Sequence, residues 1–310
     1  MYPTSEEGWA SKDFLEPASS LETRGSFFMS RKLFALWATS AIVIGFMSPA
    51  SAATPSKIIS LSPSATEDLF AIGAGKQVLA VDDLSNFPST APISKLSAFS
   101  PNVEAIAAYH PDLVILNSTA TKASDVRKQL NSLGIKVFWE ISPNSIDEAY
   151  AEISALGTVT GRSSTAAVLV ANMKREIAAA IAKYHRSKSV TFFHELDNTL
   201  YSATSDTFIG KVYKSFGLTN IADAAATADS YGYPQLTPEY LIKSNPRVIF
   251  LADGEYGESL ATLTKRVGWK NITAIRKAQV ISLPTDIPSR WGPRLVDFYQ
   301  FVGTALAKVS

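Results

Sequence analysis

Short apolar runs alternate with amphipathic stretches from residue 57 to the end of this 310-residue chain. The apolar runs are rich in Val, Ile and Phe and have few polar interruptions, as expected of parallel strands that are buried on both faces. Stretches with helical spacing of apolar residues lie between them. This alternation predicts an α/β fold with parallel sheets. The predicted strands are Lys57–Leu61, Val78–Val81, Leu113–Asn117, Lys136–Ile141, Ser189–Leu196, Arg247–Ala252 and Gln279–Leu283.

Local signals mark where the predicted helices begin and end. A Ser followed three residues later by Glu is a capping box, which satisfies free N–H groups at a helix start. A proline favours the first turn, and a glycine favours the position just after the last turn. The predicted starts are the capping boxes at Ser64 and Ser145, and Ser100 ahead of Pro101; the predicted ends are Gly73 or Gly75, and Gly134.

The stretch from Ser163 to Arg186 differs from the others because it contains neither Gly nor Pro. Its apolar residues recur every three or four positions, which predicts one amphipathic helix about 36 Å long. An ordinary crossover helix would fit the pattern, but its length and central position favour a rigid connector. We therefore predict two Rossmann-like lobes, residues 57–160 and 188–310, with central parallel sheets and a connecting helix within residues 161–187.

An internal repeat supports the two lobes. Residues 102–116 align without gaps on residues 237–251, and the alignment places Glu104 on Glu239 and Pro111 on Pro246. Each copy is a helix, a proline and a buried strand. Any two helix–strand units share some of this pattern, but the identical Glu and Pro positions favour duplication.

The N-terminal region has the pattern of an export signal. Arg31 and Lys32 precede the apolar run from Leu33 to Met47, and small residues follow up to Ala52 and Ala53. This arrangement predicts a secretory signal within residues 29–52, with residues 1–28 as an N-terminal extension upstream of it. A membrane anchor is the alternative, but the run is shorter than the roughly 20 residues that span a bilayer. We expect an exported protein.

Composition narrows the function classes. The net charge is +1, from 29 basic and 28 acidic residues, so we expect no nucleic-acid partner. The chain contains no cysteine, which excludes disulfides, Cys-ligated zinc, iron–sulfur clusters and a cysteine nucleophile. We also expect no lipoprotein anchor, because that anchor requires a cysteine.

Enzyme motifs are absent from the sequence. It contains no G-x-S-x-G, H-E-x-x-H or G-x-G-x-x-G, and only three histidines, His110, His185 and His194. His194 is a candidate ligand contact because it ends a predicted strand, where α/β sheets place their ligands, although loop structure would also explain it. A closed metal site needs three or four ligands from several elements, so we expect no metal site and no cofactor.

The segment after the last predicted strand carries the strongest binding signal. Guanidinium groups there can bind carboxylates, phosphates or amides, and an indole can stack on a flat ligand. An Arg–Asp pair that only orders the loop is the alternative. Aromatic residues in two turns, Phe99 in one and Tyr231 and Tyr233 in the other, precede the repeated helices and point to the same cleft from opposite lobes. The candidate residues of the segment are Asp286, Arg290, Trp291 and Arg294.

The repeated glutamates have two interpretations. Glu104 and Glu239 each lie in the first turn of a predicted helix, where a carboxylate stabilises the helix dipole. Because they occupy equivalent positions, one in each lobe, they could also dock onto a basic partner with two-fold symmetry.

Several segments, spread in order over the chain from residue 58, resemble the helical-backbone (class III) substrate-binding proteins of ABC importers, which serve siderophores, haem and vitamin B12. The resemblance implies two α/β lobes joined by one long helix, with the ligand between them and no catalysis. It also implies a monomer in the periplasm or on the extracytoplasmic face of the membrane. The segments are Ile58–Glu67, Pro111–Ile115, Leu133–Val137, Tyr233–Glu239 and Ser289–Arg294.

The same resemblance assigns roles to single residues. It implies that Glu104 and Glu239 pair with arginines of the importer's permease dimer. Within the family, the branch that binds vitamin B12 is most similar, and its segment after the last strand aligns without gaps on residues 283–294. Its aromatic ligand contacts fall at Phe99 and Tyr233, which stay aromatic, and at Leu84, which replaces a tyrosine.

We therefore expect a corrinoid ligand, which is itself a metal complex. A ferric siderophore or haem is the alternative ligand. An exported α/β hydrolase and a surface adhesion or receptor domain are the alternatives of other classes.

Overall fold

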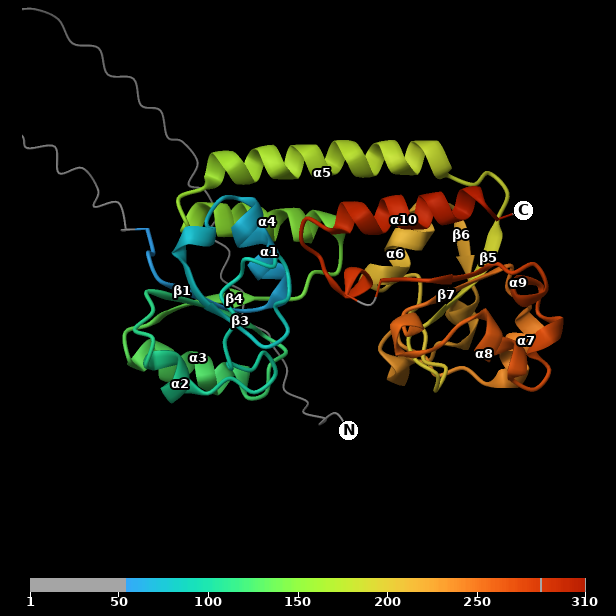
Figure 1. Ribbon diagram of the computed structural model, residues 1–310, viewed down its shortest axis with the longest axis horizontal. Coiled ribbons are helices and arrows are strands. Elements are labelled where there is room, and N and C mark those ends of the chain that lie inside the picture. Colours follow the sequence, from blue (N-terminus) through green and yellow to red (C-terminus); the bar gives the residue numbers. More distant parts are fainter. Residues whose placement is uncertain (1–53, 285, 310) are drawn as a thin grey trace, which may run out of the picture. The chain divides into compact units, whose positions relative to one another are not determined.

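The computed structural model describes residues 54–284 and 286–309, which belong to one compact unit (Figure 1). The predicted signal, residues 29–52, and the extension before it lie outside the described residues. None of the helices in the described part of the chain is long and apolar enough to cross a membrane.

Among the described residues, eight strands form two four-stranded parallel sheets, which confirms the predicted α/β fold (Figure 1). The N-terminal sheet has the order β2-β1-β3-β4 and the C-terminal sheet the order β6-β5-β7-β8, so the two orders are equivalent. The strands are β1 Ile58–Leu61, β2 Val78–Val81, β3 Leu113–Asn117, β4 Lys136–Glu140, β5 Val190–Glu195, β6 Leu218–Asn220, β7 Val248–Leu251 and β8 Val280–Ser282.

The helices cover both faces of each sheet. In Figure 1, α1 and α4 lie on one face of the N-terminal sheet and α2 and α3 on the other, whereas α6 and α10 lie opposite α7, α8 and α9. The helices are α1 Pro63–Ala71, α2 Val103–Ala107, α3 Ala123–Ser132, α4 Ile146–Val159, α5 Ser163–Tyr184, α6 Phe208–Ser215, α7 Pro238–Ser244, α8 Leu260–Lys265, α9 Thr273–Arg276 and α10 Leu295–Ala307.

The long helix α5 joins the two lobes in the chain and packs along both α4 and α10. It ends at Tyr184, two residues before the predicted end. One apolar cluster continues through both lobes against α5 and includes Ile58 of β1, Ile177 of α5 and Phe250 of β7. Separate clusters lie under α2 and α3 and under α7, α8 and α9. The shared cluster makes the interior beneath α5 continuous from lobe to lobe.

Two predicted helix starts were wrong by two residues. Ser62, not Ser64, caps α1, because Pro63 occupies the first helical position and the Ser62 hydroxyl accepts from the Ala65 N–H. Asn102, not Ser100, caps α2. The predicted start at Ser145 is confirmed, since its side chain accepts from the Glu148 N–H.

The repeated segments occupy equivalent positions in the two lobes. Strands β3 and β7 are each third in the strand order, and α2 and α7 each precede them. His110 and Asn245, which the alignment pairs, both adopt positive φ, at 51° and 46°. The structural equivalence therefore extends to single backbone angles.

Candidate functional site

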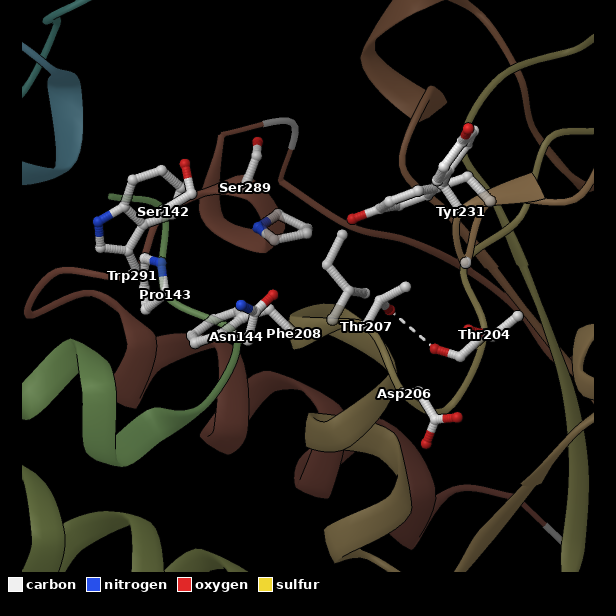
Figure 2. Close-up of a pocket in the computed structure, with 14 residues that line it drawn as sticks. Ser142, Pro143, Asn144, Thr204, Asp206, Thr207, Phe208, Tyr231, Ser289 and Trp291 are labelled. Atoms are coloured by element: carbon white, nitrogen blue, oxygen red, sulfur yellow. Dashed lines mark hydrogen bonds between the residues drawn. The ribbon is translucent and has the colours of Figure 1, made fainter. Parts of the chain in front are cut away.

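A cavity of about 490 Å³ lies between the two lobes (Figure 2). The N-terminal lobe contributes residues 142–144, which follow β4, and the C-terminal lobe contributes residues 204–209 and 231–233. The third wall is the segment between β8 and α10, residues 286–294, which we call the strap; it contributes Pro288, Ser289 and Trp291. The volume lies in the range of small-molecule sites.

Aromatic side chains dominate two sides of this cavity. Trp291 lies on one side and Tyr231 on the other (Figure 2), and Tyr233 and Phe208 also line it. Tyr231 is 84% exposed and Tyr233 is 42% exposed, so each side chain has solvent-accessible surface beside the cavity. Such rings stack on flat molecules. The predicted contacts Tyr233 and Trp291 therefore both line the cavity.

Tyr231 was predicted only as part of an aromatic turn, and not as a ligand contact. Its backbone is in the left-handed region, with φ of 48°, at the end of a short 3₁₀ turn, and Gly232 follows with φ of 84°. These two positive φ values turn the chain between Tyr231 and Tyr233, which both face the cavity. The signal in the sequence was a Tyr-Gly-Tyr-Pro turn.

A smaller cavity of about 140 Å³ adjoins the N-terminal lobe. The predicted contacts Leu84 and Phe99 line it, together with Asn117 at the end of β3, and Phe99 is 67% exposed. Ser289 and Trp291 line both cavities. The Trp291 side chain therefore lies between the two halves of one interlobe cleft.

The strap arginines are bound to carboxylates of the N-terminal lobe. Arg294 forms two hydrogen bonds to Glu67 of α1, with Nε–Oε2 at 2.9 Å and Nη2–Oε1 at 2.5 Å. Its guanidinium also lies over the Phe87 ring, 4.6 Å from the centroid. The predicted ligand contact Arg294 is therefore occupied by a bond between the lobes and lines neither cavity of the cleft.

Arg290 lines the smaller cavity but is also paired. Its Nε lies 3.8 Å from Glu67 Oε1, and its Nη2 lies 3.5 Å from Asp286 Oδ1. The other oxygen of Asp286 accepts from the Asn86 side chain at 2.5 Å. The Arg–Asp pair that orders the loop, the alternative interpretation of the sequence, is thus present, and each of its members also contacts the N-terminal lobe.

A group of buried carboxyls lies beneath the N-terminal part of the cleft. Glu140, at the end of β4, accepts from Ser62 Oγ at 2.7 Å and from Asn117 Nδ2 at 3.2 Å, and burial raises its pKa. Burial and the nearby Glu140 raise the pKa of Glu152 to about 11, so it carries a proton at neutral pH. The Trp291 indole lies close enough to lower the pKa of both groups.

Asp68 is the deepest of these acids. Its side chain is fully buried on α1, and burial together with Glu140 and Glu67 raises its pKa well above the usual value. Protonation lets such a group avoid the large cost of an unpaired buried charge. Sequence reasoning missed all four acids, because Glu67, Asp68, Glu140 and Glu152 come from three separate helices and strands.

The structure places His194 in the core and not in the cleft. The residue has no exposed surface, and its Nδ1 lies 2.9 Å from the Tyr213 hydroxyl. Burial lowers its pKa to about 4, so the ring is neutral. A polar residue near a strand end can thus be a core residue, because β5 is buried along most of its length.

Glu104 and Glu239 are exposed at the second position of α2 and α7. Neither forms an ion pair with a basic side chain within residues 54–284 and 286–309. Their permease contacts stay a prediction. Within the same residues, no group of three or more His, Cys, Asp or Glu could hold a metal ion.

Comparison with known proteins identifies the family. Residues 58–287 match the family described as periplasmic binding protein. The chain belongs to this family. It is therefore a solute-binding protein and not an enzyme, and an extracytoplasmic location goes with the family.

Three similar proteins illustrate the range within the family. An uncharacterized ABC transporter substrate-binding lipoprotein, YvrC, from Bacillus subtilis is 32% identical over 78% of this chain and 77% of its own length. A cobalamin-binding protein from Halobacterium salinarum is 28% identical over 78% of this chain and 67% of its own length. The crystal structure of a possible iron-binding, periplasmic solute-binding protein from Staphylococcus epidermidis has a TM-score of 0.71 at 25% identity. The match covers 82% of this chain and 99% of that protein. The family resemblance found in the sequence is thus confirmed.

Proposed function

We propose that this solute-binding protein carries a corrinoid to the permease of an ABC importer. The observation that carries the proposal is a cleft lined by aromatic rings, beside which the two arginines of the strap already pair with carboxylates. Trp291, Tyr231 and Tyr233 provide the rings.

The shape and polarity of the cleft suit a large flat ligand. A corrinoid is a broad macrocycle edged by carboxamide groups, which donate and accept hydrogen bonds without a net charge. The cleft offers stacking surfaces on both sides and neutral polar groups such as Asn144, Thr204 and Ser289 between them. A small number of polar groups within a mostly apolar pocket can fix the orientation of a ligand in this way.

The charge of the cleft disfavours a polyanion. Arg290 and Arg294 both pair with Glu67, and Arg290 also pairs with Asp286. The main cavity carries one further charge, the carboxylate of Asp206. An anionic siderophore or the propionates of haem would therefore have to displace existing ion pairs. The cobalamin-binding relative agrees with this inference, and the possible iron-binding relative keeps a ferric complex as the second candidate.

Titration of the purified protein with cyanocobalamin, followed by calorimetry, tests the ligand. We expect saturable one-to-one binding. Trp291→Ala should weaken it roughly tenfold or more, because stacking and apolar burial are both lost. Tyr256→Ala is the matched control, since Tyr256 is 81% exposed and lines neither cavity of the cleft.

Two outcomes would contradict the corrinoid proposal. One is saturable binding of hemin or ferric enterobactin with no binding of cyanocobalamin. The other is cyanocobalamin binding that Trp291→Ala leaves unchanged.

We further propose that Glu104 and Glu239 dock the loaded protein onto the permease. Both are exposed, and they occupy equivalent positions in the two lobes. The double variant Glu104→Arg/Glu239→Arg should abolish uptake and leave ligand affinity unchanged. Glu176→Arg, at an exposed position on α5, is the control for the added charge. An unaltered uptake rate in the double variant would reject the docking role.

A further inference from the structure

A second large cavity, of about 480 Å³, lies against one face of the connecting helix α5. Residues Lys174, Ile177 and Ile181 of α5 face it, at the spacing of one helical stripe. The opposite wall comes from α6, including Phe208 and Val212. Phe208 lines both this cavity and the main cavity of the cleft, so the two spaces share that one ring as a wall.

The body of the cavity is apolar. Ile146, Ile181 and Phe208 are partly exposed and give it accessible apolar surface, and Ile177 and Val212 lie buried behind them, at 4% and 2% exposed. Tyr150 of α4 and Tyr299 of α10 face it as well. Burial is the main reason that the pKa of each phenol is about 12, so both hydroxyls stay neutral at physiological pH. Such walls suit a hydrocarbon chain.

Two ammonium groups line the cavity beside this apolar surface. Lys174 Nζ lies 5.0 Å from the centroid of the Tyr150 ring, and Lys211 Nζ donates to the Asn144 carbonyl at 2.6 Å. Neither forms an ion pair with a carboxylate in the described part of the chain. An ammonium has three donors, so Lys211 keeps two for a ligand. Asp147 is the acid among the lining residues, which leaves a net charge of +1.

We propose that this cavity binds a single-chain amphiphile with an anionic head, such as a fatty acid carboxylate. The chain lies along Ile146, Ile181 and Phe208, and the head group lies at Lys174 and Lys211. A cationic amphiphile would meet two like charges, and a small inorganic anion would leave the apolar walls against water. The apolar lining and the two lysines together therefore favour an anionic amphiphile over a cationic amphiphile and over a small inorganic anion.

The occupant would touch both lobes. The cavity is lined by α4 from the N-terminal lobe and by α6 and α10 from the C-terminal lobe, with α5 between them. A bound chain therefore adds contacts across the connection between the lobes. This site does not depend on the identity of the ligand in the cleft.

Calorimetric titration of the purified protein with dodecanoate, below its micelle-forming concentration, tests the site. We expect one-to-one binding. Each methylene buried is worth about fourfold in affinity, so decanoate should bind roughly fifteenfold more weakly and octanoate more weakly again. Dodecyltrimethylammonium at the same concentrations should bind at least tenfold more weakly than dodecanoate.

Two matched pairs of variants locate the binding. Ala178→Phe places a ring in the cavity and should abolish binding, whereas Ala179→Phe, at the next and exposed position of α5, should not. Lys211→Gln should weaken binding about fivefold or more, whereas Lys214→Gln, on the same helix and outside the lining, should not. Ala178 is itself exposed, and thermal unfolding checks that each variant folds.

Three results would overturn the proposal. They are no dodecanoate binding by the wild-type protein, equal binding of dodecyltrimethylammonium, and dodecanoate binding that survives Ala178→Phe. If dodecanoate binding is lost in Trp291→Ala instead, the amphiphile occupies the cleft and the proposed cavity is likewise rejected.

Discussion

Both lobes bury carboxylates near the carboxyl ends of their strands, but they obtain the balancing arginines in different ways. In the C-terminal lobe, Glu195 at the end of β5 binds Arg266 through both oxygens, at 2.6 and 2.8 Å, and Glu258 joins at 2.9 Å. All three residues belong to the same lobe. In the N-terminal lobe, Glu67 binds Arg290 and Arg294 of the strap, 223 and 227 residues further along the chain.

This difference teaches what each cluster stabilises. The C-terminal cluster holds one lobe together. The N-terminal cluster fixes the strap, and with it Trp291, to helix α1 of the N-terminal lobe, where the backbone N–H of Trp291 also donates to Ser64 Oγ at 3.3 Å. The wall of the cleft is thus held by ion pairs between the lobes. Two lobes with equivalent sheets therefore both use Glu–Arg ion pairs. In the C-terminal lobe these pairs stabilise the lobe itself, and in the N-terminal lobe they fix the shape of the site.

The largest expected effect is that of Glu67→Gln. The substitution leaves two part-buried guanidinium groups without their shared carboxylate, and a guanidinium cannot lose its proton. We expect a loss of about 3 kcal/mol in the free energy of unfolding, at the lower end for a broken buried pair because both arginines keep some exposure. Urea unfolding at pH 5.5 and 8.5 should give a similar loss at both values.

Glu176→Gln, at an exposed position of α5, is the control and should change stability by less than about 0.5 kcal/mol. A loss for Glu67→Gln as small as that of the control would show that the ion pairs of Glu67 do not hold the strap.

The next effect separates the two lobes by pH. Arg266→Gln leaves Glu195 buried without its partner, but a carboxylate can take up a proton. Burial already raises the pKa of Glu195 to about 7, so at pH 5.5 it is largely protonated and gains less from Arg266. We expect a loss of about 2 kcal/mol at pH 8.5 and a clearly smaller one at pH 5.5, again by urea unfolding.

The pH dependence is the distinguishing result for this comparison. Arg276→Gln, an exposed arginine of α9, controls for the lost charge. An equal loss from Arg266→Gln at both pH values would contradict the titration of Glu195.

The smallest effect tests the protonated acid beneath the cleft. Burial, Glu140 and Asp68 raise the pKa of Glu152 to about 11, whereas the unfolded chain ionises this residue near its usual value. The folded state therefore binds one more proton between pH 8 and 9, and stability falls as the pH rises. Each such group contributes up to about 1.4 kcal/mol per pH unit. Glu152→Gln should make this slope shallower by up to that amount.

Measurement of the unfolding free energy at pH 8.0, 8.5 and 9.0 decides the point. The window lies above the pKa values of about 4, 7 and 6 for His194, Glu195 and Asp253, so these three groups add little to the slope. Identical slopes for the wild type and Glu152→Gln would mean that Glu152 is ionised in the fold.

The strands show how far sequence patterns extend. Strands β2 and β3 have the predicted bounds, and the other predicted strands are one or two residues shorter. The strand missed is β6, Leu218–Asn220, because three residues with one exposed threonine carry too little pattern. Glycines at helix ends were equally readable, since Gly73 and Gly134 have φ of 78° and 76°.

The site was predicted only in part. The aromatic residues Phe99, Tyr233 and Trp291, which were predicted from the segments between buried elements, line the cleft. The polar predictions were weaker. Arg294 faces Glu67 and His194 faces Tyr213, and no sequence pattern joins either residue to its partner. These two pairs are set by the fold, because their members lie far apart in the chain or on separate elements.

The sequence by itself determined every described strand except β6, the helix ends marked by glycine, the long connector α5 and the equivalence of the two lobes. These features depend on residues within a few positions of one another, where spacing and backbone preference act directly. Only the tertiary structure decided which arginine meets which acid, which carboxyls keep their protons and which aromatic rings face the cleft. Those outcomes depend on burial and on contacts such as Arg294 with Glu67, which lie far apart in the chain and meet only when both lobes have folded.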